Sequence, residues 1–160
     1  MQNNAPTTPK DALRAVNIVF YALIGGLLIF TAIVFSADQF LEPRLNDDNL
    51  ARILLIVVLF VAAISISTAA RLYKKRIEAT HVDGLRLMDK LDIYRSVMIT
   101  YLALCEGPGL FALISFFLTS NKLFLVITAF AVLAMLLKRP QKSKIFNELQ
   151  LNTAEQMELN

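Results

Sequence analysis

Cysteine and histidine are almost absent from this 160-residue chain, which contains one of each, Cys105 and His81. A single cysteine excludes an intrachain disulfide framework and a metal site built from several cysteines. His81 has no other ligating residues close to it in the sequence, so we expect no metal and no cofactor. The sequence also lacks a P-loop, a nucleophile elbow and an H-E-x-x-H motif. Because no catalytic constellation is present, we expect a protein that is not an enzyme.

Charged side chains are missing from four long stretches of the sequence. Residues 15–37, 53–70 and 123–137 contain none, and residues 96–121 contain only Glu106. The hydrophobic fraction is 56% and the mean hydropathy is +0.57. A helix needs roughly 20 apolar residues to cross the hydrocarbon core of a bilayer. The first three stretches satisfy this length, and the shorter fourth can cross if its flanking lysines extend their charged ends to the interfaces.

These stretches do not alternate apolar and polar residues, so they favour helices over the strands of a membrane barrel. A soluble protein would lack the polar surface to cover four such stretches, and the first is longer than the roughly 7–15 apolar residues of a signal peptide. The sequence therefore predicts an all-α membrane protein, a single domain over residues 1–160 with four transmembrane helices in a bundle. We expect helices at about 14–37, 50–73, 94–119 and 122–138, followed by a tail at 139–160.

Basic residues are distributed unevenly between the segments that connect these helices. Thirteen of the 16 Lys and Arg residues fall in the N-terminal tail, in segment 71–95 and in the C-terminal tail. Cytoplasmic segments of membrane proteins carry an excess of Lys and Arg. We therefore expect a multi-pass protein with both termini and the 139–160 tail in the cytoplasm. The basic charge needs no nucleic-acid partner, since basic and aromatic residues are not interleaved in any stretch.

The first and third apolar stretches align without a gap. "IVFYALIGGLLIFTAIVF" (18–35) and "ITYLALCEGPGLFALISF" (99–116) share seven identities in eighteen positions, and one interpretation is the duplication of a two-helix hairpin. Small residues four apart on a helix let backbones approach closely. Rows of this kind predict inward-facing packing contacts within the bundle. They contain Ala22, Gly25, Gly26, Ala63, Ser67, Ala70, Ala103 and Gly107.

Glu106 is the one acidic residue inside an apolar stretch, about midway between Arg95 and Lys122. An acid at the centre of a transmembrane helix costs about 2.5–3.5 kcal/mol on insertion scales. We therefore expect Glu106 to be protonated much of the time and to face the bundle interior.

The residues around Glu106 predict a distorted helix. Pro108 has no N–H for the carbonyl of Leu104, and Gly107 and Gly109 flank it, so a kink is expected here. A freed carbonyl beside a carboxyl group suits a proton or a small cation. The candidate site consists of Glu106, Tyr101, Thr100 and Leu104.

Two interpretations of Glu106 remain open at this point. In the first, its protonated side chain pins helices or subunits together, and the chain is a structural or assembly subunit of a membrane complex or a homo-oligomer. In the second, it belongs to a proton- or cation-coupling subunit of a transporter or motor. The expected partners are membrane lipids and other membrane subunits or further copies of the chain.

Two segments of the sequence resemble known membrane proteins. "LALCEGPGLFALISFFLTSN" (102–121) and "KRPQKSKIFNELQL" (138–151) resemble a group of small four-helix inner-membrane proteins of Bacteroidota, which share the acid-Gly-Pro turn, the "LTxN" helix exit and the "RPxKxK" tail. The resemblance covers most of the chain and implies a fold and a bacterial inner-membrane location only. Glu106 gives a looser likeness to the proteolipid subunits of rotary ATPases. This chain lacks their glycine-rich ladder and has its acid on the first helix of a hairpin, so we do not adopt that interpretation.

Overall fold

The structure, a computed structural model, describes residues 8–40, 48–81 and 85–159. The described residues form six α-helices and no strand, which confirms the all-α prediction. The segment 41–47, which contains Arg44 of the charge count, lies outside the described residues. The helices are α1 (Pro9–Asp38), α2 (Asp48–Glu78), α3 (Leu87–Thr119), α4 (Leu123–Leu137), α5 (Lys142–Glu148) and α6 (Thr153–Glu158).

Three of these helices, α1, α2 and α3, are long and apolar enough to cross a membrane. The fourth, α4, has 15 residues and is followed after a short break by α5, at an angle of 73°. At 1.5 Å per residue α4 spans about 22 Å, which is less than the roughly 30 Å of a hydrocarbon core. The length and composition of the helices therefore indicate a membrane protein with three transmembrane spans. There are four spans if α4 and α5 together form one broken span.

The long helices extend beyond the predicted boundaries. The first begins at Pro9, where Thr8 caps the helix by accepting a hydrogen bond from the Asp11 N–H at 3.3 Å. The second continues to Glu78, and the third already begins at Leu87. Charged residues end an apolar stretch without ending a helix, because Lys, Arg and Glu are good helix formers.

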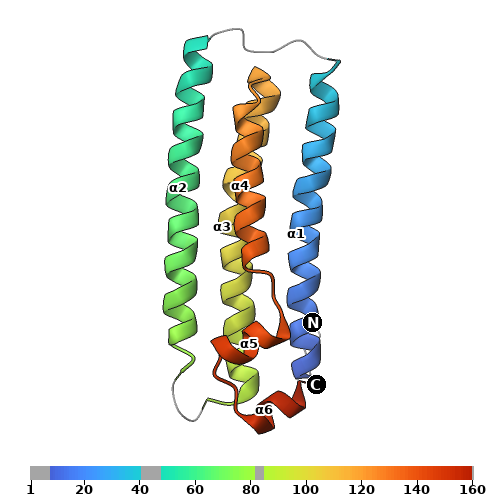
Figure 1. The fold of residues 1–160 in the computed structure, drawn as a ribbon, viewed down its shortest axis with the longest axis vertical. Helices are drawn as coiled ribbons and strands as arrows, with labels where there is room; N and C mark the ends of the chain where they lie inside the picture. Colours follow the sequence, from blue (N-terminus) through green and yellow to red (C-terminus); the bar gives the residue numbers. More distant parts are fainter. Residues whose placement is uncertain (1–7, 41–47, 82–84, 160) are drawn as a thin grey trace, which may run out of the picture.

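Helix α3 packs against α1, α2 and α4, and α4 also contacts α2. In Figure 1, α3 lies behind α4 and between the two outer helices. α3 supplies fully buried side chains to both apolar clusters, among them Met98, Leu102 and Leu113 in one and Phe116 in the other. Its position makes α3 the element on which the packing of the other three depends.

The two hairpins do not lie in equivalent surroundings. A parallel duplication would relate α1 to α3 and α2 to α4 by an axis along the membrane normal. Instead, half of the apolar window of α3 is buried, against 22% of that of α1, and α4 is half the length of α2. The structure therefore does not show the symmetry that the aligned sequences suggested.

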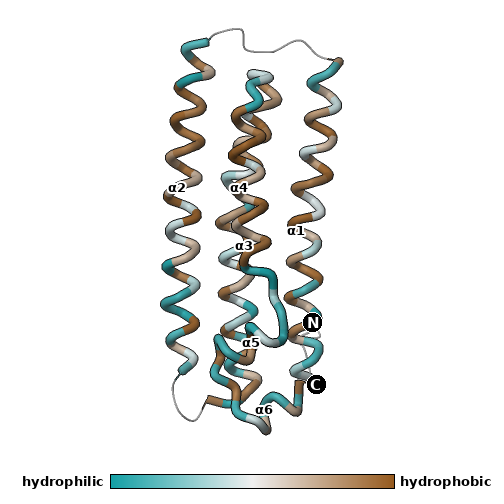
Figure 2. Tube along the Cα trace, in the orientation of Figure 1, coloured by the Kyte–Doolittle hydropathy of each residue, from teal (hydrophilic) through white to brown (hydrophobic). Residues whose placement is uncertain are grey.

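The C-terminal segment folds back across one end of the long helices (Figure 1). Ile145, Leu149 and Leu159 are buried in the same apolar cluster as Leu91. Lys90 of α3 forms an ion pair with Glu155 of α6 at 2.9 Å, with side chains 12% and 14% exposed. Figure 2 shows more hydrophilic residues at this end of α1, α2 and α3 and at the opposite tips of α1 and α2, and more hydrophobic ones along the helices between these ends and along α4. We call α5 and α6 the C-terminal cap.

A leucine at Gly109 is expected to destabilise the fold, whereas a leucine at Gly107 is not. A Cβ at Gly109 would lie 3.2 Å from Leu27 Cδ2 and 3.3 Å from Ala131 Cβ, while a Cβ at Gly107 meets no heavy atom within 4 Å. Overpacking of this kind costs about 1–3 kcal/mol. Titration of each variant with denaturing detergent, followed by circular dichroism, compares the unfolding midpoints. Equal losses in the two variants would contradict this packing.

Substituting Glu155 with Gln is expected to weaken the C-terminal cap by about 1.5–3 kcal/mol, the usual range for a charged hydrogen bond. Although burial alone would raise the pKa of Glu155, hydrogen bonds from Lys90 and the Asn152 N–H hold that pKa below its ordinary value. The stabilisation is therefore present above the unfolded pKa of about 4.3 and is lost as the pH falls through the lower folded pKa.

Hydrogen exchange of the α6 amides, corrected for intrinsic rates, measures this effect. The parent chain should lose protection at low pH, and Glu155→Gln should show weak protection at every pH. The exposed Glu158 offers a matched control, because Glu158→Gln should keep the parent's pH dependence. If Glu155→Gln also keeps it, the ion pair does not hold the cap.

Candidate functional site

Glu106 lies on α3 with a partly exposed side chain. Among the described residues, its carboxyl group makes no hydrogen bond and no ion pair, although every fully buried side-chain polar atom does have a partner. The sequence led us to expect a carboxyl group turned inward and satisfied by neighbouring helices. The structure instead shows no partner for this group in the part of the chain that it describes.

The exposed residues of α3 recur at intervals of three, four or seven and so share one side of the helix. We call this side the outer face of α3, and it consists of Asp92, Ser96, Thr100, Ala103, Gly107 and Ile114. Glu106 lies at its edge, about 60° around the helix from Ala103 and one turn after the buried Leu102. The opposite side of α3 holds Tyr101 and Cys105, which are buried. The outer face is thus the part of α3 that the other helices do not cover.

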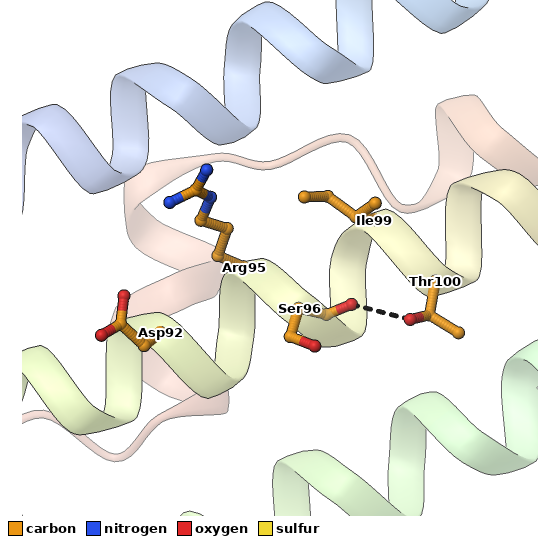
Figure 3. A pocket seen from close by; sticks show the side chains of 5 residues that line it. All are labelled: Asp92, Arg95, Ser96, Ile99 and Thr100. Atoms are coloured by element: carbon orange, nitrogen blue, oxygen red, sulfur yellow. Dashed lines mark hydrogen bonds between the residues drawn. The ribbon is translucent and has the colours of Figure 1, made fainter. Parts of the chain in front are cut away.

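An open hollow of about 390 Å³ lies over the outer face toward the end that carries the C-terminal cap. Figure 3 shows that it lies between the ribbons of α1 and α2, with Arg95 extending toward α1. The Thr100 hydroxyl donates to the Ser96 carbonyl at 2.9 Å, within its own helix. Four of the five residues that line the hollow are polar or charged, and the lining comprises Asp92, Arg95, Ser96, Ile99 and Thr100.

The predicted partners of Glu106 are not brought together around it. Tyr101 is buried on the other side of α3, where its hydroxyl donates to the Ala134 carbonyl at 3.1 Å and its ring packs edge-on against Tyr73. Thr100 lies on the outer face, and Leu104 packs against the apolar cluster. The described residues of one chain therefore do not assemble the proton or cation site that the sequence suggested.

The Gly107–Pro108–Gly109 triplet does not interrupt α3, which is helical from Leu87 to Thr119. The expected kink therefore does not appear as a break in the helix. Pro108 and Gly109 are buried, and the Gly109 carbonyl accepts a hydrogen bond from the Thr128 hydroxyl of α4 at 3.3 Å. Gly109 thus serves the close approach of α3 to α1 and α4.

The rows of small residues do not face inward as the sequence led us to expect. No heavy atom lies within 4 Å of a Cβ at Gly25, Gly26 or Gly107, and Gly25 is half-buried. The contacts within the chain are made on other sides of the helices, by larger residues such as Phe20 and Leu27. The remaining members of the rows are exposed and comprise Ala22, Gly26, Ala63, Ser67, Ala70, Ala103 and Gly107.

A polar group near the C-terminal cap was not anticipated from the sequence. The Tyr73 hydroxyl donates to a Glu148 carboxylate oxygen at 2.5 Å, and Lys138 Nζ lies 3.3 Å from the other oxygen and 4.1 Å from the centre of the Tyr73 ring. A pocket of about 350 Å³ adjoins these three residues and Tyr101. Glu148 is 75 residues from Tyr73 in the sequence, so no local pattern indicates their contact.

Comparison of the chain with protein-family models, with curated proteins and with solved structures found no match. The function therefore has to be inferred from the residues of this chain, and the outer face of α3 is the feature that its own packing leaves unexplained.

Substituting Glu106 with Gln is expected to leave the stability of the isolated chain unchanged within about 0.5 kcal/mol, because the carboxyl makes no hydrogen bond or ion pair with any residue that the structure describes. Tyr101→Phe should lower the free energy of unfolding by about 0.5–1.5 kcal/mol, since it removes the hydrogen bond to Ala134. Unfolding of the detergent-solubilised single chain provides the comparison. A larger loss for Glu106→Gln than for Tyr101→Phe would show that Glu106 has a partner inside the chain.

Proposed function

We propose that this chain is a structural or assembly subunit of a complex, or of a homo-oligomer, in the bacterial inner membrane. The observation that carries the proposal is the Glu106 carboxyl, which lies in an otherwise apolar stretch and has no partner among the described residues. An acid at this depth costs about 2.5–3.5 kcal/mol when it faces lipid. A neighbouring subunit that accepts or donates a hydrogen bond there offsets this cost.

The small residues of the outer face support the same proposal. Ala103 and Gly107 are exposed next to Glu106, and a Cβ at Gly107 would meet nothing. Association of helices in lipid depends on close packing and on hydrogen bonds between helices, and small residues allow both. A helix from another subunit can therefore approach α3 closely at the level of Glu106.

The distribution of basic residues supports an orientation with both termini in the cytoplasm. The beginning of α1 and the end of α6 lie at the same end of the long helices in Figure 1. Of the 16 Lys and Arg residues, 13 fall in the segments assigned to this side. Because cytoplasmic segments carry an excess of Lys and Arg, this distribution supports a cytoplasmic location for this end and the C-terminal cap.

Proton or cation coupling is the second candidate function, and one observation favours it. The hollow that is lined by Ser96 and Thr100 lies on the same helix side as Ala103 and Gly107, which border Glu106. Thr100 and Glu106 are six residues apart, or about 9 Å along the axis. In an assembly, polar groups of this hollow would connect the cytoplasmic surface with the carboxyl group.

Substituting Glu106 with Leu, or Gly107 with Leu, is expected to reduce assembly in the host membrane. The first change removes the hydrogen-bonding group, and the second fills the space that the partner helix would occupy. Native electrophoresis of mildly solubilised membranes should show the tagged chain in a smaller particle in both variants. Ala129→Leu provides the matched control, because Ala129 is an exposed small residue of α4.

Glu106→Gln distinguishes the two candidate functions. A structural role requires only hydrogen bonds, so this variant should assemble and work as the parent does. If it assembles but loses function, coupling is the role of Glu106. If the particle size is the same in the parent, Glu106→Leu and Gly107→Leu, the assembly proposal is wrong.

A further inference from the structure

Another cavity, distinct from the hollow over α3 and from the pocket beside Tyr73, lies between the beginning of α1 and the C-terminal cap. It is on a different part of the molecule from Glu106. Its volume is about 320 Å³, at the lower end of the roughly 300–1,000 Å³ of small-molecule sites. Figure 1 shows the chain after α6 beside the first turns of α1. α1 contributes Lys10, Leu13, Arg14 and Asn17, and the cap contributes Lys142, Ile145 and Leu159.

Three cations and no acidic residue line this cavity. Lys10 and Arg14 are one turn apart on α1, and Lys142 comes from α5. Like charges at this spacing on a helix repel one another. Among the described residues none of the three forms an ion pair, whereas Lys74, Lys90 and Lys138 each do. The cavity therefore concentrates positive charge that no ion pair within the described ranges 8–40, 48–81 and 85–159 neutralises.

Lys142 is held at the cavity by a hydrogen bond from its Nζ to the Leu159 carbonyl at 3.0 Å. A lysine ammonium group has three donors, so two remain for a ligand. Arg14 adds a planar guanidinium group, which suits bidentate contact with a phosphate. The chain is thus folded so that donors from two segments 128 residues apart, at Arg14 and Lys142, converge on one space.

The floor of the cavity is apolar, since Leu13, Ile145 and Leu159 are buried. The charge-free stretch of α1 begins directly after Arg14, so the cations lie where a membrane span meets the interface. Lys10 and Arg14 are separated by about 6 Å along the helix axis. This separation matches a headgroup layer of roughly 5–8 Å on each side of the hydrocarbon core.

We propose that this cavity binds a phosphate oxyanion, carried by an anionic phospholipid of the surrounding leaflet. The three cations would contact the phosphate, and the apolar floor would contact the glycerol and the beginning of the acyl chains. Basic pockets at the cytoplasmic side of membrane helices bind anionic headgroups in this way. Free phosphate offers the same oxyanion without the apolar part, so the two sources can be separated by experiment.

Native mass spectrometry of the purified full chain tests the proposal with three probes: phosphatidylglycerol, phosphatidylcholine and inorganic phosphate. The parent should bind phosphatidylglycerol at least about tenfold more tightly than phosphatidylcholine. In the triple variant Lys10→Gln, Arg14→Gln, Lys142→Gln, that affinity should fall about a hundredfold, because each cation removed should cost about a fivefold loss. Retention of phosphate but not of phosphatidylglycerol would identify free phosphate as the ligand of the same site.

The control removes the same charge elsewhere, with Lys74→Gln, Lys75→Gln and Arg76→Gln at the end of α2. It should keep most of the affinity for phosphatidylglycerol, and Lys10→Arg with Lys142→Arg should bind as the parent does. If the cavity triple variant and the α2 triple variant lose equal affinity for phosphatidylglycerol, general charge attraction explains the binding and the proposed site is wrong. The proposal also fails, whatever the variants' folding, if the parent shows no preference for phosphatidylglycerol and does not bind phosphate.

Discussion

The packing of α3 against α1, α2 and α4 is the constraint on which the rest of the structure depends. The buried side of α3 carries Met98, Cys105 and Ala112, which are fully enclosed by the other helices. Because successive residues on a helix are about 100° apart, burying these residues turns Ala103 and Gly107 to the opposite side and leaves Glu106 at the edge of that side. A carboxyl group and small residues are thus presented at a surface that, in a membrane, faces lipid or another protein.

The membrane spans could be predicted from sequence because charge ends an apolar stretch. The structure has helices long and apolar enough to cross a membrane at the first three predicted positions, and a 15-residue helix at the fourth. The orientation of α3 could not be predicted. Apolar residues occur on every side of this helix, so its periodicity does not distinguish the inner side from the outer one. The inward placement of Glu106 was inferred from the cost of a carboxyl group in lipid, which applies to the assembled protein and not to one chain. The prediction that the rows around Gly26 and Gly107 face inward was wrong for the same reason. Small residues favour close contact between helices, but they do not indicate whether the partner helix belongs to the same chain.

The C-terminal cap shows a second limit of local sequence patterns. Its contacts join residues that are far apart, such as Lys90 with Glu155 and Tyr73 with Glu148. The capping box of Asn152 and Glu155 is visible in the sequence, but the lysine that neutralises Glu155 is not. By anchoring α5 and α6 on the long helices, these pairs also fix Lys142 beside Arg14. The cap therefore links the stability of one end of the fold to the basic cavity that it helps to form.

The central claim is that another helix covers the outer face of α3 at the level of Glu106 in the membrane. A spin label introduced by Ala103→Cys, in a Cys105→Ser background, reports contact with lipid through its accessibility to dissolved oxygen. A label introduced by Phe130→Cys gives the reference, because Phe130 is 63% exposed on α4. In the host membrane the account predicts that position 103 is shielded relative to position 130, and that it becomes accessible in the isolated chain. Equal accessibility of the two positions in the host membrane would contradict it.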